Sequence, residues 1–433
     1  MIKKAILTPL QKFVNIESFA GLLLLASTVI ALIWANSPMG DSYQELWQYE
    51  LGFSTPILEI NKPLILWVND GLMAIFFFLI GLEIKRELLI GELNSMKKMA
   101  FPLFGALGGM LIPVIFFLII NQNPETTRGW GIPMATDIAF SLAVLKVLGK
   151  RIPLSLIIFL TAFAIVDDIG AVVVIALFYS GDLQLDLLGY ASILLAFLYF
   201  LSYKEIYLKY LSTAMGILVW ILFLKSGIHP TLAGILMAFS VPIRQKIKTN
   251  EFITELENIT HQFKNAEVLD DEILSGDQIT QIDNLEDLAE RYQSPLQRLE
   301  HNLHGWVAYF IIPIFALANA GVAFGNVNNL DTMLIINIIV CLVLGKSIGI
   351  TSIIVIAKKL KIIEIPQDLN IQHIIGVSFL AGIGFTMAIF IAGLAFQMDP
   401  IYIDSAKIGI LIGSFLSGLL GYIVLRMAPS TQK

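Results

Sequence analysis

Long apolar runs follow one another along most of the chain, and short polar segments separate them. An α-helix needs about 20 residues to cross the roughly 30 Å hydrocarbon layer of a membrane. Runs of this length predict an all-α integral membrane protein with about twelve transmembrane helices, numbered here as spans in chain order. The predicted spans cover residues 18–35, 64–84, 99–121, 132–149, 152–179, 185–202, 207–225, 228–243, 303–325, 333–357, 371–396 and 405–427.

The composition excludes a soluble protein. Hydrophobic residues make up 57% of the 433 positions and charged residues only 14%, and the mean hydropathy is +0.79. A soluble domain is about a quarter charged, so these residues cannot cover a water-facing surface. The single Cys341 excludes a disulfide framework and a cysteine metal cluster. We therefore expect a lipid bilayer around the chain, no cofactor and no nucleic-acid partner.

Basic residues fall mainly in alternate connecting segments, which sets the orientation. Lys and Arg concentrate in the cytoplasmic loops of membrane proteins. With the N-terminus inside, the outside segments contain only Lys62, Arg128, Lys225 and Lys407. This asymmetry predicts an even number of spans and a multi-pass protein of the bacterial inner membrane, with both termini cytoplasmic.

One inside segment, residues 244–301, differs in composition from the rest and separates spans 1–8 (1–243) from spans 9–12 (302–433). This insert has six basic and thirteen acidic residues, a net charge of −7. Two sets of apolar residues recur in it at helical spacing: Phe252, Leu256, Ile259, Phe263 and Leu285, Leu288, Tyr292, Leu299. They predict two amphipathic helices joined by the acidic segment 267–277. The alternative is a solvated, partly disordered insert.

Four ionisable side chains stand out within the predicted spans: Asp137, Asp167, Asp168 and Lys346. A charge at the centre of a bilayer costs at least about 2.5–3.5 kcal/mol, so each of them requires a reason. Neighbouring helix positions point about 100° apart, so Asp167 and Asp168 face different partners. A purely structural Asp167–Lys346 ion pair is one explanation, but it leaves two carboxylates unexplained. Surplus negative charge at mid-membrane indicates a site for a cation or protons.

Backbone breaks are predicted near the same depth. Pro133 lies at the start of span 4, and Gly382 and Gly384 lie within span 11. Exposed backbone groups are tolerated inside a membrane only where protein or a cavity surrounds them. Spans 3–5 and 10–12 are therefore predicted to be inverted repeats, each with an interrupted middle helix. Glycine that permits close helix packing is the alternative reading.

Five segments together resemble the signatures of the NhaA-type Na⁺/H⁺ antiporters. They are Met134–Phe140 (MATDIAF), Val166–Ala171 (VDDIGA), Gly382–Met387 (GIGFTM), Gly81–Glu87 (GLEIKRE) and Pro295–His301 (PLQRLEH). The similarity runs through all predicted spans in order, and the long insert is the main departure. Inverted repeats are a known property of that family, so they agree with the resemblance and are no independent discovery.

The resemblance implies a role for each membrane charge. Asp168 is expected to be the principal Na⁺ ligand, and Asp167 a second carboxylate that alternates between the cation and Lys346. Asp137 is expected where the interrupted helices cross, offsetting their positive N-termini, while Lys346 offsets the C-terminal ends. Thr136 is expected to contribute a hydroxyl or carbonyl oxygen. Such hard oxygen ligands suit Na⁺ and Li⁺.

The function implied is exchange of internal Na⁺ or Li⁺ for external H⁺, by a transporter and not an enzyme. Buried carboxylates that share a site hold protons and release them when a cation binds, so the two compete. Two protons for one Na⁺ would move one net charge per cycle, worth about 2.3 kcal/mol per 100 mV.

Two other function classes are compatible with charges in the membrane. A sodium-coupled symporter would need a substrate pocket with further polar groups. An intramembrane aspartyl protease also needs two carboxylates, but the Gly-x-Gly-Asp segment typical of such enzymes does not occur in the sequence.

A second titratable set is predicted at the inside rim: Glu83, Arg86, Glu87, Glu300, His301 and His304. Histidine changes charge near neutrality, and the resemblance implies that this set senses pH. An ordinary polar helix end is the alternative. Asp70, in span 2, is either a secondary polar group of the cation path or an acid buried by packing. The resemblance also implies a homodimer through the outside segment 43–60.

Overall fold

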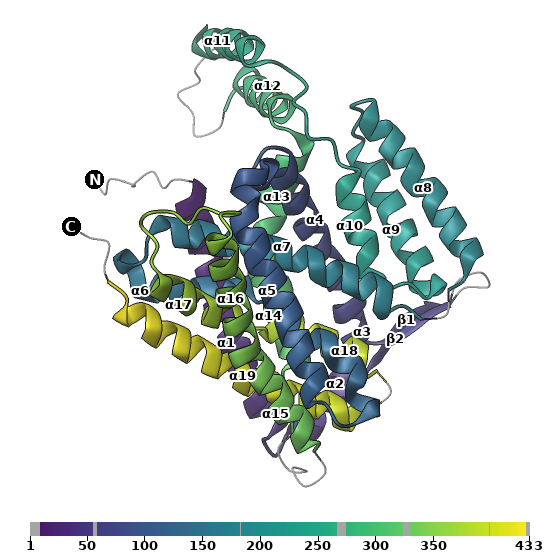
Figure 1. The fold of residues 1–433 in the computed structure, drawn as a ribbon. Helices are drawn as coiled ribbons and strands as arrows, with labels where there is room; N and C mark the ends of the chain where they lie inside the picture. The colour runs from purple at the N-terminus through teal and green to yellow at the C-terminus, as the bar shows by residue number, and fades with distance from the viewer. Residues whose placement is uncertain are drawn as a thin grey trace.

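A computed structural model describes residues 9–54, 59–181, 183–265, 274–323, 330–397 and 399–429 of the protein. Long apolar helices stand side by side in a bundle, and α11 (Thr249–Asn265) and α12 (Gly276–Tyr292) project from one end of it (Figure 1). We call this end of the bundle the insert end. The predicted cytoplasmic termini, residues 1–8 and 430–433, lie outside the described residues.

The helical and apolar character of the chain is confirmed. Among the described residues, eight helical segments are long and apolar enough to cross a membrane, or up to eleven if each of three bent pairs counts as one span. The eight are Leu64–Leu89 (α3, Leu64–Leu66; η1, Trp67–Leu72; α4, Met73–Leu89), Met99–Ile120 (within α5, Met96–Ile120), Leu154–Phe178 (α7), Leu185–Tyr203 (α8), Lys209–Ser226 (α9), Pro295–Asn319 (α13, Pro295–Trp306; η5, Val307–Ile311; α14, Ile312–Asn319), Thr332–Lys359 (α15, Thr332–Val340; η7, Cys341–Gly345; α16, Lys346–Lys359) and Pro400–Met427 (α19). Two short 3₁₀ turns, η2 (Glu92–Asn94) and η4 (Gly149–Arg151), connect neighbouring helices.

The first bent pair does not form one span. Helix α2 (Gly40–Gln48) turns 113° away from α1 (Pro9–Ala35). An antiparallel hairpin of β1 (Glu50–Ser54) and β2 (Glu59–Pro63) follows it. The sequence did not predict these strands. Strand β1 and the first two residues of β2 lie in the outside segment 43–60 through which a dimer is expected, and residues 55–58 of that segment lie outside the described residues.

The predicted span 228–243 is shorter in the structure than a membrane is thick. Its helix, α10 (Thr231–Phe239), has nine residues, which at 1.5 Å each span only about 14 Å. Lys85 Nζ donates hydrogen bonds to the carbonyl oxygens of Phe239 and Val241, at 2.7 and 2.6 Å. The lysine therefore satisfies carbonyl groups that the end of a helix leaves without partners.

Spans 4 and 11 are interrupted, as predicted. The 3₁₀ helix η3 (Pro124–Met134) meets α6 (Ile138–Leu148) at 46°, and α17 (Ile371–Ala381) meets α18 (Phe385–Ala395) at 43°. Span 4 begins at Pro124, before the predicted start at residue 132. The 3₁₀ helix η3 forms the first half of this span and α6 forms the second half. The break therefore lies in the middle of the span and not at its beginning.

The two breaks contact each other through the backbone. The backbone N–H of Asp137 donates to the carbonyl oxygen of Ile383 at 2.6 Å. Gly382 lets the break in span 11 pack closely against spans 10 and 12, because a Cβ atom there would overlap the carbonyl oxygen of Leu342 and lie 2.6 Å from Ser417 Oγ. The interrupted helices thus cross inside the bundle, where protein surrounds the exposed backbone groups.

Within the described ranges, three spans contain a π-helical turn that the sequence did not predict. They are η1, which includes Asp70, η5 in span 9, and η7, which ends at Gly345 directly before Lys346. Such turns are frequent at functional sites because they shift the register of the side chains that follow.

The two amphipathic helices predicted in the insert are confirmed as α11 and α12. The rings of Phe252 and Tyr292 stack at 4.1 Å, and Arg291 Nη1 pairs with Glu255 Oε2 at 3.0 Å. The assignment of Leu299 to the second helix is wrong: Leu299 lies on α13, because Ser294 and Pro295 start a new helix there. Residues 266–273, most of the predicted acidic joining segment, lie outside the described residues.

Candidate ion-binding site

Lys346 and Asp167 form a fully buried ion pair. The exposed fractions of the two side chains are 0% and 1%, and Lys346 Nζ lies 3.2 Å from Asp167 Oδ2. Lys346 Nζ also donates a hydrogen bond to Thr136 Oγ1. The pairing of Lys346 with Asp167 that the sequence allowed is therefore present.

Thr136 connects Lys346 to the end of a broken helix. Its hydroxyl donates to the carbonyl oxygen of Ala381, the last residue of α17, at 3.0 Å. The carbonyl end of a helix is electronegative, and cations near it are stabilised. Lys346 thus reaches this carbonyl end through the threonine hydroxyl rather than directly.

Asp137 lies against two helix N-termini. Its Oδ1 accepts from the backbone N–H of Phe140 in α6 at 3.2 Å. Its Oδ2 accepts from both the backbone N–H and the hydroxyl of Thr386 in α18, at 3.2 and 2.6 Å. A carboxylate here caps both helices and offsets their positive ends. Sequence reasoning did not single out Thr386, which is the second residue of α18.

The two adjacent aspartates have different surroundings. Asp167 Oδ1 is buried and has no hydrogen-bond partner, although Oδ2 of the same carboxylate pairs with Lys346. Asp168 is only partly buried and lines a cavity. A buried carboxylate oxygen without a partner is costly, so it marks a place where a cation or proton would be stabilised.

The cavity has a volume of about 70 Å³ for water-sized occupants and joins the membrane site to the insert-end rim. Its polar walls come from spans 2, 4, 5, 9 and 11. They consist of Glu83, Arg86, Thr136, Asp137, Thr161, Asp168, His304 and Thr386. Asp167 and Lys346 are not among the lining residues and lie behind Thr136.

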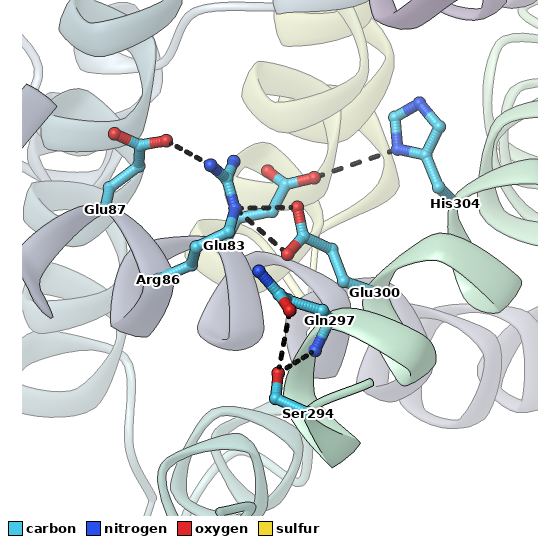
Figure 2. A network of polar contacts seen from close by, with 7 residues as sticks. All are labelled: Glu83, Arg86, Glu87, Ser294, Gln297, Glu300 and His304. Atoms are coloured by element: carbon cyan, nitrogen blue, oxygen red, sulfur yellow. Dashed lines mark hydrogen bonds and ion pairs between the residues drawn. The ribbon is translucent and has the colours of Figure 1, made fainter. Parts of the chain in front are cut away.

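The rim residues form a network in which Arg86 is central (Figure 2). Arg86 Nε lies 3.0 Å from both carboxylate oxygens of Glu300, and Arg86 Nη1 lies 2.7 Å from Glu87 Oε1. His304 Nδ1 lies 3.8 Å from Glu83 Oε1. Residues separated by more than 200 positions are thereby brought together at the mouth of the cavity.

The start of α13 sets the position of two members of this network. Ser294 Oγ accepts from the backbone N–H of Gln297 at 3.2 Å, and Pro295 occupies the first turn (Figure 2). Glu300 and His304 follow on the same helix face, four residues apart. His301 belongs to the same helix but is exposed and makes none of the contacts drawn in Figure 2.

Asp70 lies apart from the cavity. Its Oδ2 pairs with Lys62 Nζ at 2.8 Å, and its Oδ1 lies 3.7 Å from His229 Nε2. Trp220 Nε1 donates to its carbonyl oxygen at 2.9 Å. Asp70 does not line the described cavity, so this geometry agrees with an acid buried by packing and ion pairing.

The remaining predicted positions belong to the backbone of the breaks. Pro133 is the penultimate residue of η3, directly before the extended segment that leads to Asp137. Gly384 is the N-cap of α18, and a Cβ atom there would lie 3.1 Å from the carbonyl oxygen of Ala135. Both positions are therefore at the crossing.

Comparison with known proteins identifies the family. The sequence profile described as Na⁺/H⁺ antiporter 1 matches residues 11–425, nearly the whole chain. The chain belongs to the NhaA family of Na⁺/H⁺ antiporters. It is similar to a protein of Saccharophagus degradans named Na(+)/H(+) antiporter NhaA 1, with 45% identity over 96% of this chain and 91% of the relative.

Further relatives carry the same name. A protein of Oleidesulfovibrio alaskensis named Na(+)/H(+) antiporter NhaA is 45% identical over 98% of this chain and 94% of its own length. A protein of Parabacteroides distasonis with that name is 41% identical over 99% of this chain and 98% of its own length. The similarity therefore covers all the segments that build the crossing.

Proposed function

We propose that this protein exchanges internal Na⁺ for external H⁺ at the site formed by Asp167, Asp168 and Thr136. The observation that carries the proposal is the divided environment of Asp167: one carboxylate oxygen pairs with Lys346, and the other is buried without a hydrogen-bond partner. Next to it, Asp168 is open to the cavity. Together they offer a cation oxygen ligands of the kind that Na⁺ prefers.

The exchange follows from competition at these two carboxylates. Without a cation, two neighbouring carboxylates in a low-dielectric site are stabilised by protons, because like charges repel strongly there. A Na⁺ ion that enters through the cavity displaces the protons and draws Asp167 away from Lys346. When the same site then opens to the other side, the cation leaves and protons return. Occupancy by either species, but not both, makes the transport an exchange.

Asp137 and Lys346 balance charge at the crossing. Asp137 faces two positive helix N-termini, and Lys346 reaches a negative helix end through Thr136. We propose that these interactions fix the crossing while the ligands of the cation change. The role follows the general rule that half-helices in transporters direct their ends at the ion site, a rule for which this family is itself an example.

The size of the cavity favours an ion over an organic substrate. Pockets for small molecules usually have volumes of about 300–1,000 Å³, whereas this cavity has about 70 Å³. A sodium-coupled symporter would have to accommodate a second, larger substrate. We therefore propose Na⁺, Li⁺ and H⁺ as the transported species.

We further propose that exchange is electrogenic and regulated by pH. Two protons per Na⁺ would let an inside-negative membrane potential drive Na⁺ export. The rim network of Glu83, Arg86, Glu300 and His304 lies on the cavity or directly beside it, so a change in its charge would alter the field along the path of the cation. His301 and Glu87 would contribute from the periphery.

The finer architecture is also a proposal. We infer twelve spans, with α10 and its flanking residues as the eighth, and inverted repeats formed by spans 3–5 and 10–12. The matching bends of 46° and 43° in the middle span of each repeat support this arrangement. We place the protein in the inner membrane with both termini cytoplasmic, and we infer a homodimer through the 43–60 segment with its hairpin.

Proton release tests the proposed function directly. Purified protein in weakly buffered detergent should release protons when Na⁺ or Li⁺ is added, and it should not do so with choline. Asp168→Asn is the control, because its fold is expected to survive while one of the titrating carboxylates is lost. Proteoliposomes loaded with a pH-sensitive dye should show Na⁺-dependent proton movement. Absence of both signals in folded wild-type protein would overturn the proposal.

A further inference from the structure

The N-terminus of α18 faces the ion site and has a second support besides Asp137. Ser414 of α19 is buried, and its hydroxyl oxygen accepts hydrogen bonds from the backbone N–H groups of Gly384 and Phe385, both at 3.2 Å. These are the N-cap and the first residue of α18. The N–H groups at a helix N-terminus have no partners within the helix, so Ser414 satisfies two of them from a neighbouring span.

Two acceptor groups therefore share the donors of this terminus. Ser414 Oγ takes the first two N–H groups, and Asp137 Oδ2 takes the N–H and hydroxyl of Thr386. The positive end of α18 is held between a neutral acceptor and a carboxylate. Because Gly384 has no side chain, it offers no local cap of its own, and Ser414 takes that place.

We infer that Ser414 is a positioning residue for cation binding, resting on the proposed exchange function. Its hydroxyl fixes the direction of the α18 N-terminus and offsets part of its positive charge. Without this acceptor, two buried N–H groups lose their partner and the terminus becomes more positive toward the site. A more positive site binds Na⁺ less well, although the ligands Asp167 and Asp168 are unchanged.

The supporting span also contacts the turn that precedes Lys346. Ser417 lies one turn after Ser414 in α19, and its hydroxyl donates to the carbonyl oxygen of Leu342 at 3.4 Å. Leu342 belongs to the π-helical turn η7. One face of span 12 thus supports both the positive helix end opposite Asp137 and the segment that carries Lys346.

The test compares three serine variants by their apparent KM for Na⁺ and their kcat in proteoliposomes. Ser414→Ala removes the acceptor and should raise the apparent KM for Na⁺ about three- to tenfold, with kcat changed less than about twofold. Ser414→Thr retains the hydroxyl and should restore most of the affinity. Ser405→Ala is the matched control: Ser405 is buried in the same helix and accepts the backbone N–H of Asp331 at 2.9 Å, away from the crossing. It should leave KM unchanged.

The outcomes separate this inference from the proposed function. If wild-type protein exchanges Na⁺ for H⁺ but Ser414→Ala has the wild-type KM, the positioning role is wrong and the function stands. The same conclusion follows if Ser414→Ala and Ser405→Ala lower only the amount of folded protein. If Ser414→Ala does not fold, Ser414→Cys replaces it, because a thiol is of similar size to the hydroxyl but accepts hydrogen bonds only weakly. An unchanged KM for Na⁺ in the Ser414→Cys variant would equally overturn the inference.

Discussion

Asp137 and Thr386 are 249 residues apart in the chain, yet the hydroxyl of Thr386 donates to Asp137 Oδ2 at 2.6 Å. The backbone N–H of the same threonine donates to the same oxygen at 3.2 Å. One carboxylate from span 4 thereby caps the second half of span 11, while its other oxygen caps the second half of its own span. This double cap holds the two broken helices together at the depth of the ion site.

Thr386→Val should weaken the crossing while it preserves side-chain shape. Hydrogen bonds to charged groups contribute about 1.5–3 kcal/mol, so the free energy of unfolding should fall by roughly this amount. Thermal unfolding in detergent measures the change. Thr161→Val is the matched control, since Thr161 also lines the cavity but its hydroxyl donates to Ile157 of its own helix. Equal melting temperatures for the two variants would contradict the double cap.

Asp167→Asn and Asp168→Asn should each abolish Na⁺/H⁺ exchange and leave the protein folded. Asparagine retains the shape of the side chain but provides no negative charge and no titrating group. Dye quenching in proteoliposomes reports exchange, and size-exclusion chromatography reports folding. Normal exchange by a well-folded Asp168→Asn variant would show that the cation binds elsewhere.

Lys346→Ala should destabilise the protein strongly. The substitution leaves Asp167 buried without its counter-charge, and breaking a buried pair in this way commonly costs about 3–5 kcal/mol. A double-mutant cycle with Asp167→Asn measures the coupling between the two residues. In the Asp167→Asn protein, Lys346→Ala should change the melting temperature by a different amount than it does in the wild-type protein. Additive effects of the two substitutions on thermal unfolding would show that the ion pair contributes nothing to stability.

The sequence predicted much of this site because membrane charges are rare and each one requires a partner. The pairing of Asp167 with Lys346 followed from there being few buried cations, and the breaks followed from Gly and Pro in apolar runs. Thr386 and Ser414 were missed for a different reason. Hydroxyl side chains are unremarkable within a span. Only the three-dimensional structure shows that the Thr386 hydroxyl donates to Asp137 and that the Ser414 hydroxyl caps α18 from another helix.

The fold was predicted less completely where apolar patterning carries no information. The first half of span 4 is a 3₁₀ helix with polar residues, so its start at Pro124 was not recognised. The π-helical turn before Lys346 follows α15, which contains no Gly or Pro that would signal a change of helix type. The hairpin β1–β2 lies in a segment that was read only as an outside loop.

Glu290→Gln should leave the shape of the pH–activity curve unchanged between about pH 6 and 9. Arg298 of α13 donates a hydrogen bond to Glu290 of α12, which lowers the pKa of this carboxyl below its ordinary value of 4.5. A carboxylate with a lowered pKa in the folded state adds stability above its unfolded pKa and loses it as pH falls through the folded value. The pair is therefore fully charged throughout the tested range.

The Arg298–Glu290 ion pair also contributes little to the free energy of unfolding, because half of the Glu290 side chain is exposed (52%). Exposed pairs contribute about 0–1 kcal/mol. Exchange rate against pH for Glu290→Gln and wild-type protein checks the prediction. A displaced curve would mean that the contact between α12 and α13 itself takes part in the response to pH.

The effect of the insert's net charge on the rim is distinct from the effect of the Arg298–Glu290 contact. Residues 244–301 have a net charge of −7 and lead directly into the helix of Glu300 and His304. Negative charge near a histidine stabilises its protonated form, but exposed charges are screened beyond about 8 Å at physiological salt. In Figure 1, α11 lies on the far side of α12 from the bundle, so its charges act over the longer distance.

Replacing residues 249–293 with a short neutral linker should therefore change regulation without changing the ion site. The apparent Na⁺ affinity at saturating pH should stay nearly constant, because none of the cavity-lining residues is removed. The midpoint of activation should move to lower pH, since removing negative charge near the rim makes protonation there less favourable, and high salt should shrink the shift. Exchange rate against pH at low and high salt measures both effects. Loss of Na⁺ binding would place the insert in the transport machinery, and superimposable curves at both salts would show that its charge has no influence on the rim.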